Sequence, residues 1–576
     1  MFMKIRLYIL FSVFFFLQCD LKAESNDKNF EYDWVNHPTY LYQNIIIDTT
    51  STSHTLFLET LGEKKGIMSS LLPFFQLKKV NSNITVGLKY KTKGCKNLSV
   101  IITSVGECEN INSIDTIQLR PTEDWVEFSR IINTKNTYLL NISIETIALN
   151  NNNANVWISD FGIFIEGVDL LNKIGGIKEK RHINKKDVIH WDNINYHTLP
   201  FFEHRILALG ETTHGTKTMN DIAIAILKER ILKHQCRLVL LEIPLEYSFY
   251  INRFVKNDSN FNLSDISTYL DGFLYSESIV SFIQWLKEYN STSIENVSIW
   301  GFDINHVQLK SRVDLFNFLY SLNMNRHIEG LDDICKLLLD TEISFEKIIS
   351  LLNENNNLAT VLNDDELKLI FHCLKITRQY SSSYYRFINR DKAMTEITTF
   401  IVDNFLKKNE TATIFGHFGH LNYLSIQDLS ILNYFSLGYY MRSKYKDDYR
   451  CIALTTNQGT ALLTKSAGTL GVSKLIHAPQ ESLEYQLKGL NIDSIYFSIN
   501  KLDCSDVFKL RFVGGSNTEN QFRYIIPKSR MDGILFINQA VSIEKKEDVL
   551  KSNLNHDFII MNSYKEALEK INKTRK

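Results

Sequence analysis

The chain has 576 residues, of which 44% are hydrophobic, 12% aromatic and 22% charged. This composition is typical of globular domains and excludes a mainly disordered or fibrous chain, and the length predicts two or three domains. The 64 Lys and Arg residues nearly balance the 65 Asp and Glu residues. We therefore expect no nucleic acid or acidic membrane as a partner, because no overall positive field would attract either of them.

Residues 1–23 have the pattern of a secretory signal peptide. Two basic residues precede an apolar run from 7 to 17, and the small residue Ala23 follows at a suitable cleavage point. The run is too short to span a bilayer comfortably, so we predict an exported protein that is periplasmic, secreted or held at the outer surface. Cys19 raises the alternative of a lipid anchor, although the residues before it fit a lipidation site poorly.

Residues 28–168 contain short segments in which apolar and polar side chains alternate, which is typical of half-buried β-strands. Strands are predicted over 83–90, 98–105, 125–132, 138–147 and 155–166. Their number and spacing favour a small all-β sandwich, for which glycan contact is a candidate role. Trp125 and Trp157 are the candidates for stacking on a sugar, but a buried place in the core is the favoured interpretation for both.

The eight cysteines contain no C-x-x-C pair, so the sequence gives no support to a zinc knuckle or a thioredoxin-type site. Cys95 and Cys108 flank one apolar strand. Two alternatives stay open for them: a disulfide in an oxidising compartment, or two isolated buried thiols. Most other cysteines lie at apolar positions and are predicted as core residues.

A segment rich in Lys and Gly, 169–194, is predicted as a linker, and a different pattern begins at about residue 195. Buried strands that alternate with helical segments predict an α/β domain over 195–576, with a mainly parallel sheet and helices on both faces. A helical pattern over 308–408 contains no clear strand and predicts a helical insertion that roofs a cleft. The strands are expected at 205–210, 237–243, 297–304, 411–415, 450–456, 493–499 and 533–538, with a helix over 218–233.

Charged and imidazole side chains follow four of these predicted strands. In open α/β sheets ligands bind beyond the carboxyl ends of the strands, so we expect these side chains to meet at one edge. For any one of them a structural hydrogen bond is the favoured interpretation, but the set together favours a site. The residues, in chain order, are Glu211, His214, Glu242, Asp303, His417 and His420.

Neutral imidazole beside carboxylates is a general-base arrangement, because the carboxylate fixes the tautomer and makes the ring more basic. The alternative is a metal site, since zinc and manganese also accept imidazole and carboxylate ligands. The chain has no H-E-x-x-H motif, no G-x-S-x-G nucleophile elbow and no Walker A sequence. An ordinary serine esterase is therefore disfavoured.

Several ordered motifs resemble those of the erythromycin esterase family. The resemblance covers about 195–540 and leaves the N-terminal β region outside. The first motif, Gly210-Glu211-Thr212-Thr213-His214-Gly215, is similar to the family's G-E-x-x-H-G signature. The similar segments that follow are Leu240-Leu241-Glu242, Trp285 with Asn290, Gly301-Phe302-Asp303, Arg390-Asp391 with Met394, Gly416-His417-Phe418-Gly419-His420, and 438–459.

The resemblance implies metal-independent, cofactor-free hydrolysis of a small-molecule ester or lactone, with macrolide lactone opening as the namesake activity. It implies His214 as the base that activates water, and Glu211 and Glu242 as the residues that orient and polarise the site. His417 would assist, for example at the developing oxyanion. The implied supporting residues are His420, Asp303 and Arg390.

Three positions depart from the family pattern. Ala223 stands where Arg or Lys is common, Thr218 where an acidic residue is common, and Phe418 where Asn is usual. Lys217 is the candidate for the missing positive charge. Two alternatives to a metal-free hydrolase therefore remain: an envelope binding protein with impaired catalysis, and a metal-dependent hydrolase that uses the same His and carboxylate cluster.

Overall fold

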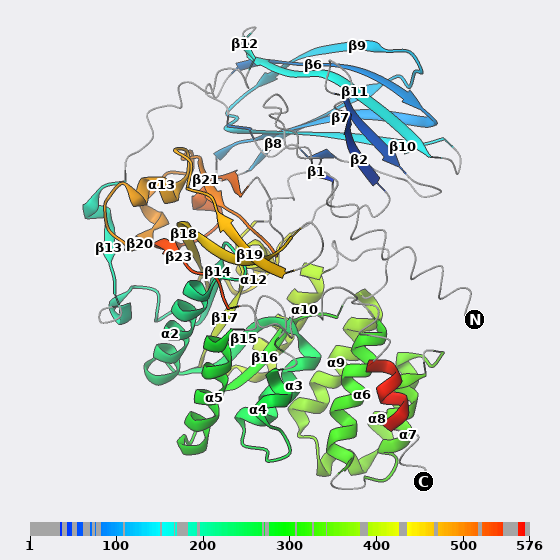
Figure 1. Cartoon of the computed structure of the whole chain (residues 1–576), viewed down its shortest axis with the longest axis vertical. Helices are drawn as coiled ribbons and strands as arrows, with labels where there is room; N and C mark the ends of the chain where they lie inside the picture. Colours follow the sequence, from blue (N-terminus) through cyan, green and yellow to red (C-terminus); the bar gives the residue numbers. More distant parts are fainter. Residues whose placement is uncertain are drawn as a thin grey trace.

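The computed structural model contains a β-sandwich near the N-terminus and a larger α/β part (Figure 1). It describes most of residues 82–570 and, before residue 82, only short strands between 35 and 76. The predicted signal peptide and Cys19 lie outside the described residues. So do 108–109, 150–152, 166–167, 170–182, 193–195, 268–269, 271–275, 306–307, 325–327, 341, 381–389, 425–434, 466–469, 516–520, 545–562 and 571–576.

Two antiparallel sheets form the sandwich, with strand orders β5-β10-β7-β8 and β2-β3-β11-β6-β9. Strands are present at all five predicted positions. Alternation along β6 places Ile84, Val86 and Leu88 in the core between the sheets. The strands are β2 (Gln43–Asp48), β3 (Thr55–Thr60), β5 (Phe75–Gln76), β6 (Ser82–Lys93), β7 (Cys95–Val105), β8 (Ile111–Leu119), β9 (Val126–Thr134), β10 (Leu139–Ala148) and β11 (Ala154–Ile165). The short strands β1 (Val35–Asn36) and β4 (Ser70–Leu71) pair with each other, and β12 (Val168–Asp169) pairs with β11.

The favoured interpretation of the two tryptophans as buried core residues is wrong. Trp125 is 45% exposed, and Trp157 is half-buried. Trp157 pairs in register with Lys91 of β6, and the Lys91 ammonium lies 5.1 Å from the Trp125 ring and 5.0 Å from the Trp157 ring. Because neighbouring Val156 and Ile158 point into the core, Trp157 between them points to the solvent face of the sheet.

Cys95 is a free, buried thiol, so the alternative of a disulfide between Cys95 and Cys108 is wrong. Its sulfur lies 3.6 Å from the Thr146 hydroxyl and 3.5 Å from the Asn155 carbonyl oxygen. Cys108 lies outside the described residues. Cys504, in the α/β part, is disulfide-bonded.

The second part contains a sheet with strand order β13-β20-β23-β18-β14-β17-β15-β16, and β19 pairs with β18. Pairing is parallel from β16 to β23 and antiparallel at β20, β13 and β19, so the sheet is mixed rather than simply parallel. The strands are β13 (Val188–His190), β14 (Ile206–Glu211), β15 (Cys236–Pro244), β16 (Ser298–Asp303), β17 (Thr411–His417), β18 (Tyr449–Thr464), β19 (Leu470–Leu475), β20 (Ser494–Ser498) and β23 (Gly533–Ala540).

The predicted start of the α/β domain at residue 195 is wrong. β13 lies inside the segment 169–194 that was predicted as a linker, and it pairs antiparallel with β20. A strand of three residues at a sheet edge is too short for its alternation to stand out in the sequence. The sheet therefore begins before residue 195.

Helices pack on this sheet and extend away from it (Figure 1). The insertion 308–408 is helical, and its described residues contain no strand. Its last helix, α10, packs on β15 and β16 and brings Arg390 to the sheet. No described helix combines the length and the apolar character needed to cross a membrane. The helices are α2 (Lys217–Lys233), α3 (Leu245–Val255), α4 (Leu263–Ser267), α5 (Glu277–Thr292), α6 (Gln308–Met324), α7 (Leu331–Leu339), α8 (Phe345–Glu354), α9 (Asp364–Tyr380), α10 (Arg390–Phe405), α11 (Phe418–Leu421), α12 (Leu437–Tyr445) and α13 (Leu483–Lys488).

Candidate active site

A tight turn at the end of β14 presents His214. Gly215 has a φ of +72°, a backbone conformation that side chains with a Cβ rarely adopt. A Cβ at this position would also lie 2.0 Å from the Leu462 carbonyl oxygen. The turn therefore requires glycine directly after His214.

Glu211 and His214 form a buried carboxylate–imidazole pair. Nδ1 of His214 lies 2.7 Å from Oε1 of Glu211, and the Glu211 side chain is 1% exposed while that of His214 is 14% exposed. The other carboxylate oxygen, Oε2, is buried and has no hydrogen-bond partner in the part of the chain that the structure describes. The carboxylate thus fixes one ring nitrogen of an imidazole that still reaches solvent.

Burial and the pair interaction shift both pKa values. Burial raises the pKa of Glu211, although its hydrogen bond to His214 opposes this shift. Burial lowers the pKa of His214, but the hydrogen bond to Glu211 and the charge of that carboxylate outweigh burial and raise it. An imidazole with a raised pKa is a stronger base once it has lost its proton.

Glu242, at the end of β15, is held in a different way. Its Oε1 accepts a hydrogen bond from Arg390 at 2.9 Å, and its Oε2 accepts one from the backbone N–H of His417 at 2.6 Å. Burial would raise the pKa of Glu242, but the charges of His420, His214 and Arg390 lower it to about 2. Glu242 therefore stays ionised, and it ties the end of β15 to the end of β17.

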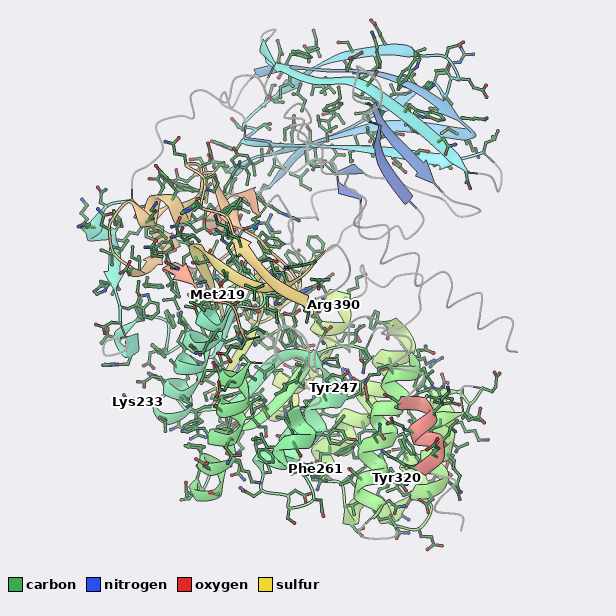
Figure 2. The ribbon with its side chains drawn as sticks, viewed as in Figure 1. Met219, Lys233, Tyr247, Phe261, Tyr320 and Arg390 are labelled. Atoms are coloured by element: carbon green, nitrogen blue, oxygen red, sulfur yellow. The ribbon has the colours of Figure 1, made fainter. Side chains whose placement is uncertain are left out.

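Arg390, which Figure 2 labels, contacts side chains from the ends of β15 and β16 and from α11. Its guanidinium donates to both carboxylate oxygens of Asp303, at 3.0 and 2.7 Å, as well as to Glu242. Nη1 lies 3.0 Å from Nε2 of His420. Since arginine only donates hydrogen bonds, Nε2 of the neutral His420 ring accepts this one, and Nδ1–H donates to Oδ1 of Asp391 at 2.9 Å. Burial lowers the pKa of His420, but the charges of Asp391 and Glu242 together outweigh burial and raise it, so the ring gains charge as the pH falls.

Both ring nitrogens of His417 are engaged. Nδ1 accepts a hydrogen bond from the backbone N–H of Gly419 at 3.2 Å, so the proton lies on Nε2, which donates to the Val513 carbonyl oxygen at 3.2 Å. Burial and the charge of His214 lower the pKa of His417 well below its usual value. His417 is therefore a neutral imidazole of defined tautomer, 4.6 Å from the ring of His214 between centroids.

The structure brings seven of the eight sequence-predicted site residues into one cluster, and the chemical roles assigned to them stay predictions. Lys217 does not join the cluster: its side chain is 44% exposed on α2, and its ammonium pairs with Asp221 at 2.6 Å. The clustered residues are Glu211, His214, Glu242, Asp303, Arg390, His417 and His420.

The structure places the three residues that depart from the family pattern. Ala223 is fully buried in the core. The Thr218 hydroxyl accepts a hydrogen bond from the backbone N–H of Val541. Phe418 is fully buried and fills the space beside Gly210, where a Cβ would lie 2.9 Å from its Cα atom.

The imidazole and carboxylate groups of the cluster are not arranged as metal ligands. Among the described residues, no group of three or more His, Cys, Asp and Glu side chains has an arrangement that could hold a metal ion. The carboxylates of Glu242 and Asp303 face the guanidinium of Arg390. The cluster therefore contains its own cation.

The sequence analysis missed three participants. Asp391 fixes the tautomer of His420, the carbonyl of Val513 fixes that of His417, and the ring of Phe512 lies 5.1 Å from the ring of His417 in an edge arrangement. Asp391 directly follows Arg390 in one of the family-like motifs, so its position beside a predicted site residue could have indicated a role in the site. Val513 acts through its main-chain carbonyl, which every residue type has, so the sequence could not indicate its role.

Comparison with known proteins gives a family match for one part of the chain. Residues 352–540 match the model of the erythromycin esterase family. This part of the chain is therefore similar to that family. The matched segment includes Arg390, His417 and His420, whereas Glu211, His214 and Glu242 precede it. The match supports a hydrolase acting on ester bonds.

Solved structures that match the chain include a Bacillus cereus protein, with 16% identity over 62% of this chain and 94% of that chain, and a TM-score of 0.48. An erythromycin esterase variant in its open conformation has 16% identity over 61% of this chain and 95% of that chain, and a TM-score of 0.42. A xylan-binding domain from Paenibacillus barcinonensis has 13% identity over 23% of this chain and 85% of that domain, and a TM-score of 0.18. Among curated proteins none matches the chain.

Proposed function

We propose that the chain is an exported hydrolase that cleaves an ester or lactone with His214 as the general base. The observation that carries the proposal is the hydrogen bond of 2.7 Å between Glu211 and an imidazole that still reaches solvent. In the reactive state Nδ1–H of His214 donates to the carboxylate, and Nε2 takes a proton from the attacking water. The same nitrogen then returns that proton to the leaving alcohol.

The negative charge that develops on the ester oxygen needs a donor or a cation. For His417 to supply the donor, its Nε2–H would have to leave the Val513 carbonyl. The guanidinium of Arg390, whose side chain is 23% exposed, is the second candidate. We assign a holding role to Glu242, because all of its described contacts fix neighbouring groups.

The experiment is a panel of carboxylic esters and lactones tested on wild type, His214→Ala and the exposed-surface control His477→Ala. We expect hydrolysis by wild type and by the control, and a loss of about two to four orders of magnitude in His214→Ala. The thermal midpoint of His214→Ala should stay within a few degrees of wild type. Hydrolysis by His214→Ala at the wild-type rate would refute the mechanism. If wild type cleaves no member of the panel, the result favours the alternative of a binding protein with impaired catalysis.

Export is part of this proposal. The disulfide at Cys504 supports it, because disulfides persist mainly in oxidising compartments outside the cytosol. Fractionation of cells that express the full chain, with a cytosolic marker protein as control, tests the prediction. Recovery of the protein with the cytosolic marker, with residues 1–23 still attached, would contradict it.

We also propose glycan contact through the β-sandwich, a role that the exposure of Trp125 favours. The indoles of Trp125 and Trp157 flank the ammonium of Lys91 on a solvent face, where a sugar ring can stack and a hydroxyl can accept from the amine. Retention of wild type, Trp125→Ala and the control Ile131→Ala on insoluble xylan and cellulose tests this. Ile131 is 68% exposed on β9. Equal retention of all three proteins, or none, would contradict the role.

A further inference from the structure

A two-stranded hairpin connects the β-sandwich with the active site. Its strands, β21 (Phe508–Arg511) and β22 (Phe522–Ile525), pair antiparallel. At its base, Val507 and Ile526 form one buried cluster with Val105 and Leu139, which pair across β7 and β10 of the sandwich. All four side chains are at most 6% exposed. The base of the hairpin is thus packed against the sandwich.

The opposite end of the hairpin holds the two neighbouring histidines. The carbonyl of Val513 accepts hydrogen bonds from the backbone N–H of His214, at 3.3 Å, and from Nε2 of His417, at 3.2 Å. The N–H of Val513 donates to the Thr212 carbonyl at 2.8 Å. Phe512 packs against the His417 ring. One peptide segment therefore sets the positions of both rings.

Arg511 makes the connection between these ends rigid. It is fully buried, and its guanidinium donates to the carbonyls of Thr456 and Asn457 and to the Gln521 side chain, at 2.7 to 3.0 Å. Val507 and Val513 are six residues apart, about 20 Å along an extended strand. The disulfide-bonded Cys504 lies four residues before β21 and restrains the chain where the hairpin begins.

We propose that the β-sandwich is a positioning module for hydrolysis, which sets the arrangement of His214 and His417 through the 508–525 hairpin. Leu139 and Val507 are then positioning residues, because they act on the site only through the hairpin. This inference rests on the proposed hydrolase function. It differs from a passive tether, for which the packing at the base of the hairpin would not affect the chemistry.

Two adjacent leucines on β10 provide a matched test. Leu139 packs in the cluster at the base of the hairpin, whereas Leu140 points into the core of the sandwich, and both side chains are 0% exposed. Replacing either one by alanine creates a cavity of similar size and destabilises the sandwich. Only the cavity at Leu139 lies on the path to the histidines.

We expect Leu139→Ala to lower kcat by about five- to tenfold with KM changed less than twofold, since displacement of the base weakens the reacting geometry more than substrate contact. Leu140→Ala should keep kcat within about twofold of wild type, with a comparable fall in the thermal midpoint. Leu139→Met, which nearly conserves volume, should restore kcat. Equal kcat values for Leu139→Ala and Leu140→Ala would overturn the proposal.

Hydrogen exchange followed by mass spectrometry separates this inference from the proposed reaction, because it needs no substrate. Leu139→Ala should increase exchange at least threefold in peptides that contain the amides of His214 and Val513, and Leu140→Ala should not. If the protein cleaves no ester but these peptides respond in this way, the coupling holds and the proposed function fails. If it cleaves esters and both variants leave these peptides unchanged, the coupling fails alone.

Discussion

Two neighbouring regions of the sheet edge each present a glutamate, and the two glutamates differ in their hydrogen-bond partners and in the direction of their pKa shifts. At the end of β14, Glu211 has a single imidazole partner and one buried oxygen without a hydrogen-bond partner among the described residues. At the end of β15, Glu242 accepts from a guanidinium and from a backbone N–H. Burial raises the pKa of the first carboxyl, whereas neighbouring charges lower that of the second to about 2.

The difference indicates two roles: Glu211 takes part in proton transfer through His214, whereas Glu242 holds neighbouring groups in place. A carboxylate with few donors shares a proton readily with its imidazole, and the energy of that pair changes as the ring gains or loses charge. A carboxylate satisfied by Arg390 and a backbone N–H has the same charge throughout the reaction. The same residue type therefore serves two purposes, and the number of nearby donors decides which.

The largest expected effect concerns the β14 side. Glu211→Gln removes the negative charge that orients His214 and stabilises its protonated form, so kcat should fall by about two to four orders of magnitude. Steady-state kinetics on any ester that wild type cleaves measures this. Tyr445→Phe, which removes a hydroxyl bonded to Asp403 away from the site, serves as the control. A Glu211→Gln enzyme with more than a tenth of the wild-type kcat would remove the contrast between the two glutamates.

On the other side of the sheet edge, Arg390→Met should lower the stability of the fold. It leaves Glu242 and Asp303 buried without their cation, and breaking a buried pair in this way costs about 3–5 kcal/mol of unfolding free energy. Urea denaturation measures the change. The surface pair of Arg205 and Asp448 is more exposed, so Arg205→Met should cost less than about 1 kcal/mol. Similar losses of unfolding free energy in both variants would show that the ion pairs of Arg390 do not stabilise the fold more than a surface pair does.

Acid should weaken the protein through Glu242. The pKa is about 2 in the folded state and 4.5 ordinarily, so its contribution is present above pH 4.5 and is lost as the pH falls towards 2. The difference corresponds to on the order of 3 kcal/mol. Glu211 has the opposite sign, because its raised pKa favours folding below pH 4.5 and this contribution is lost as the pH rises. Unfolding free energies measured from pH 2 to 7 should show a flatter acid limb in Glu242→Gln, and an unchanged limb would contradict the assignment.

A smaller effect is expected in the pH dependence of the rate. The base must be neutral, and the pKa of His214 is raised above 6.5 by Glu211, so kcat/KM should rise with pH to a plateau with its midpoint above 6.5. In Glu211→Gln the residual activity should show a lower midpoint. A midpoint that does not move would mean that another group titrates in the profile.

The last prediction is that removal of metal ions has no effect on hydrolysis. Because the carboxylates of Glu242 and Asp303 face Arg390, we predict that chelators leave hydrolysis unchanged. Activity after dialysis against EDTA, with metal analysis of the purified protein, tests this. A stoichiometric metal whose removal abolishes activity would support the metal-dependent alternative.

Much of this arrangement was predictable because parallel strands end at the same edge. Apolar runs placed β14 to β18, and the polar residues after them converge in the structure. The 508–525 hairpin was not predicted, because each of its strands has four residues and Val513 acts through its backbone. Trp125 and Trp157 were misjudged because residue type was weighed above position: Trp157 alternates with buried Val156 and Ile158.

Gly416 limits how this site can be redesigned. A Cβ there would lie 2.8 Å from Oε2 of Glu242, and at Gly215 it would collide with main chain. A mutational library aimed at new substrates would therefore lose nearly every clone that varies these two positions. Phe512 is half-buried and its ring packs against that of His417, so a smaller or polar side chain there would also disturb the position of His417.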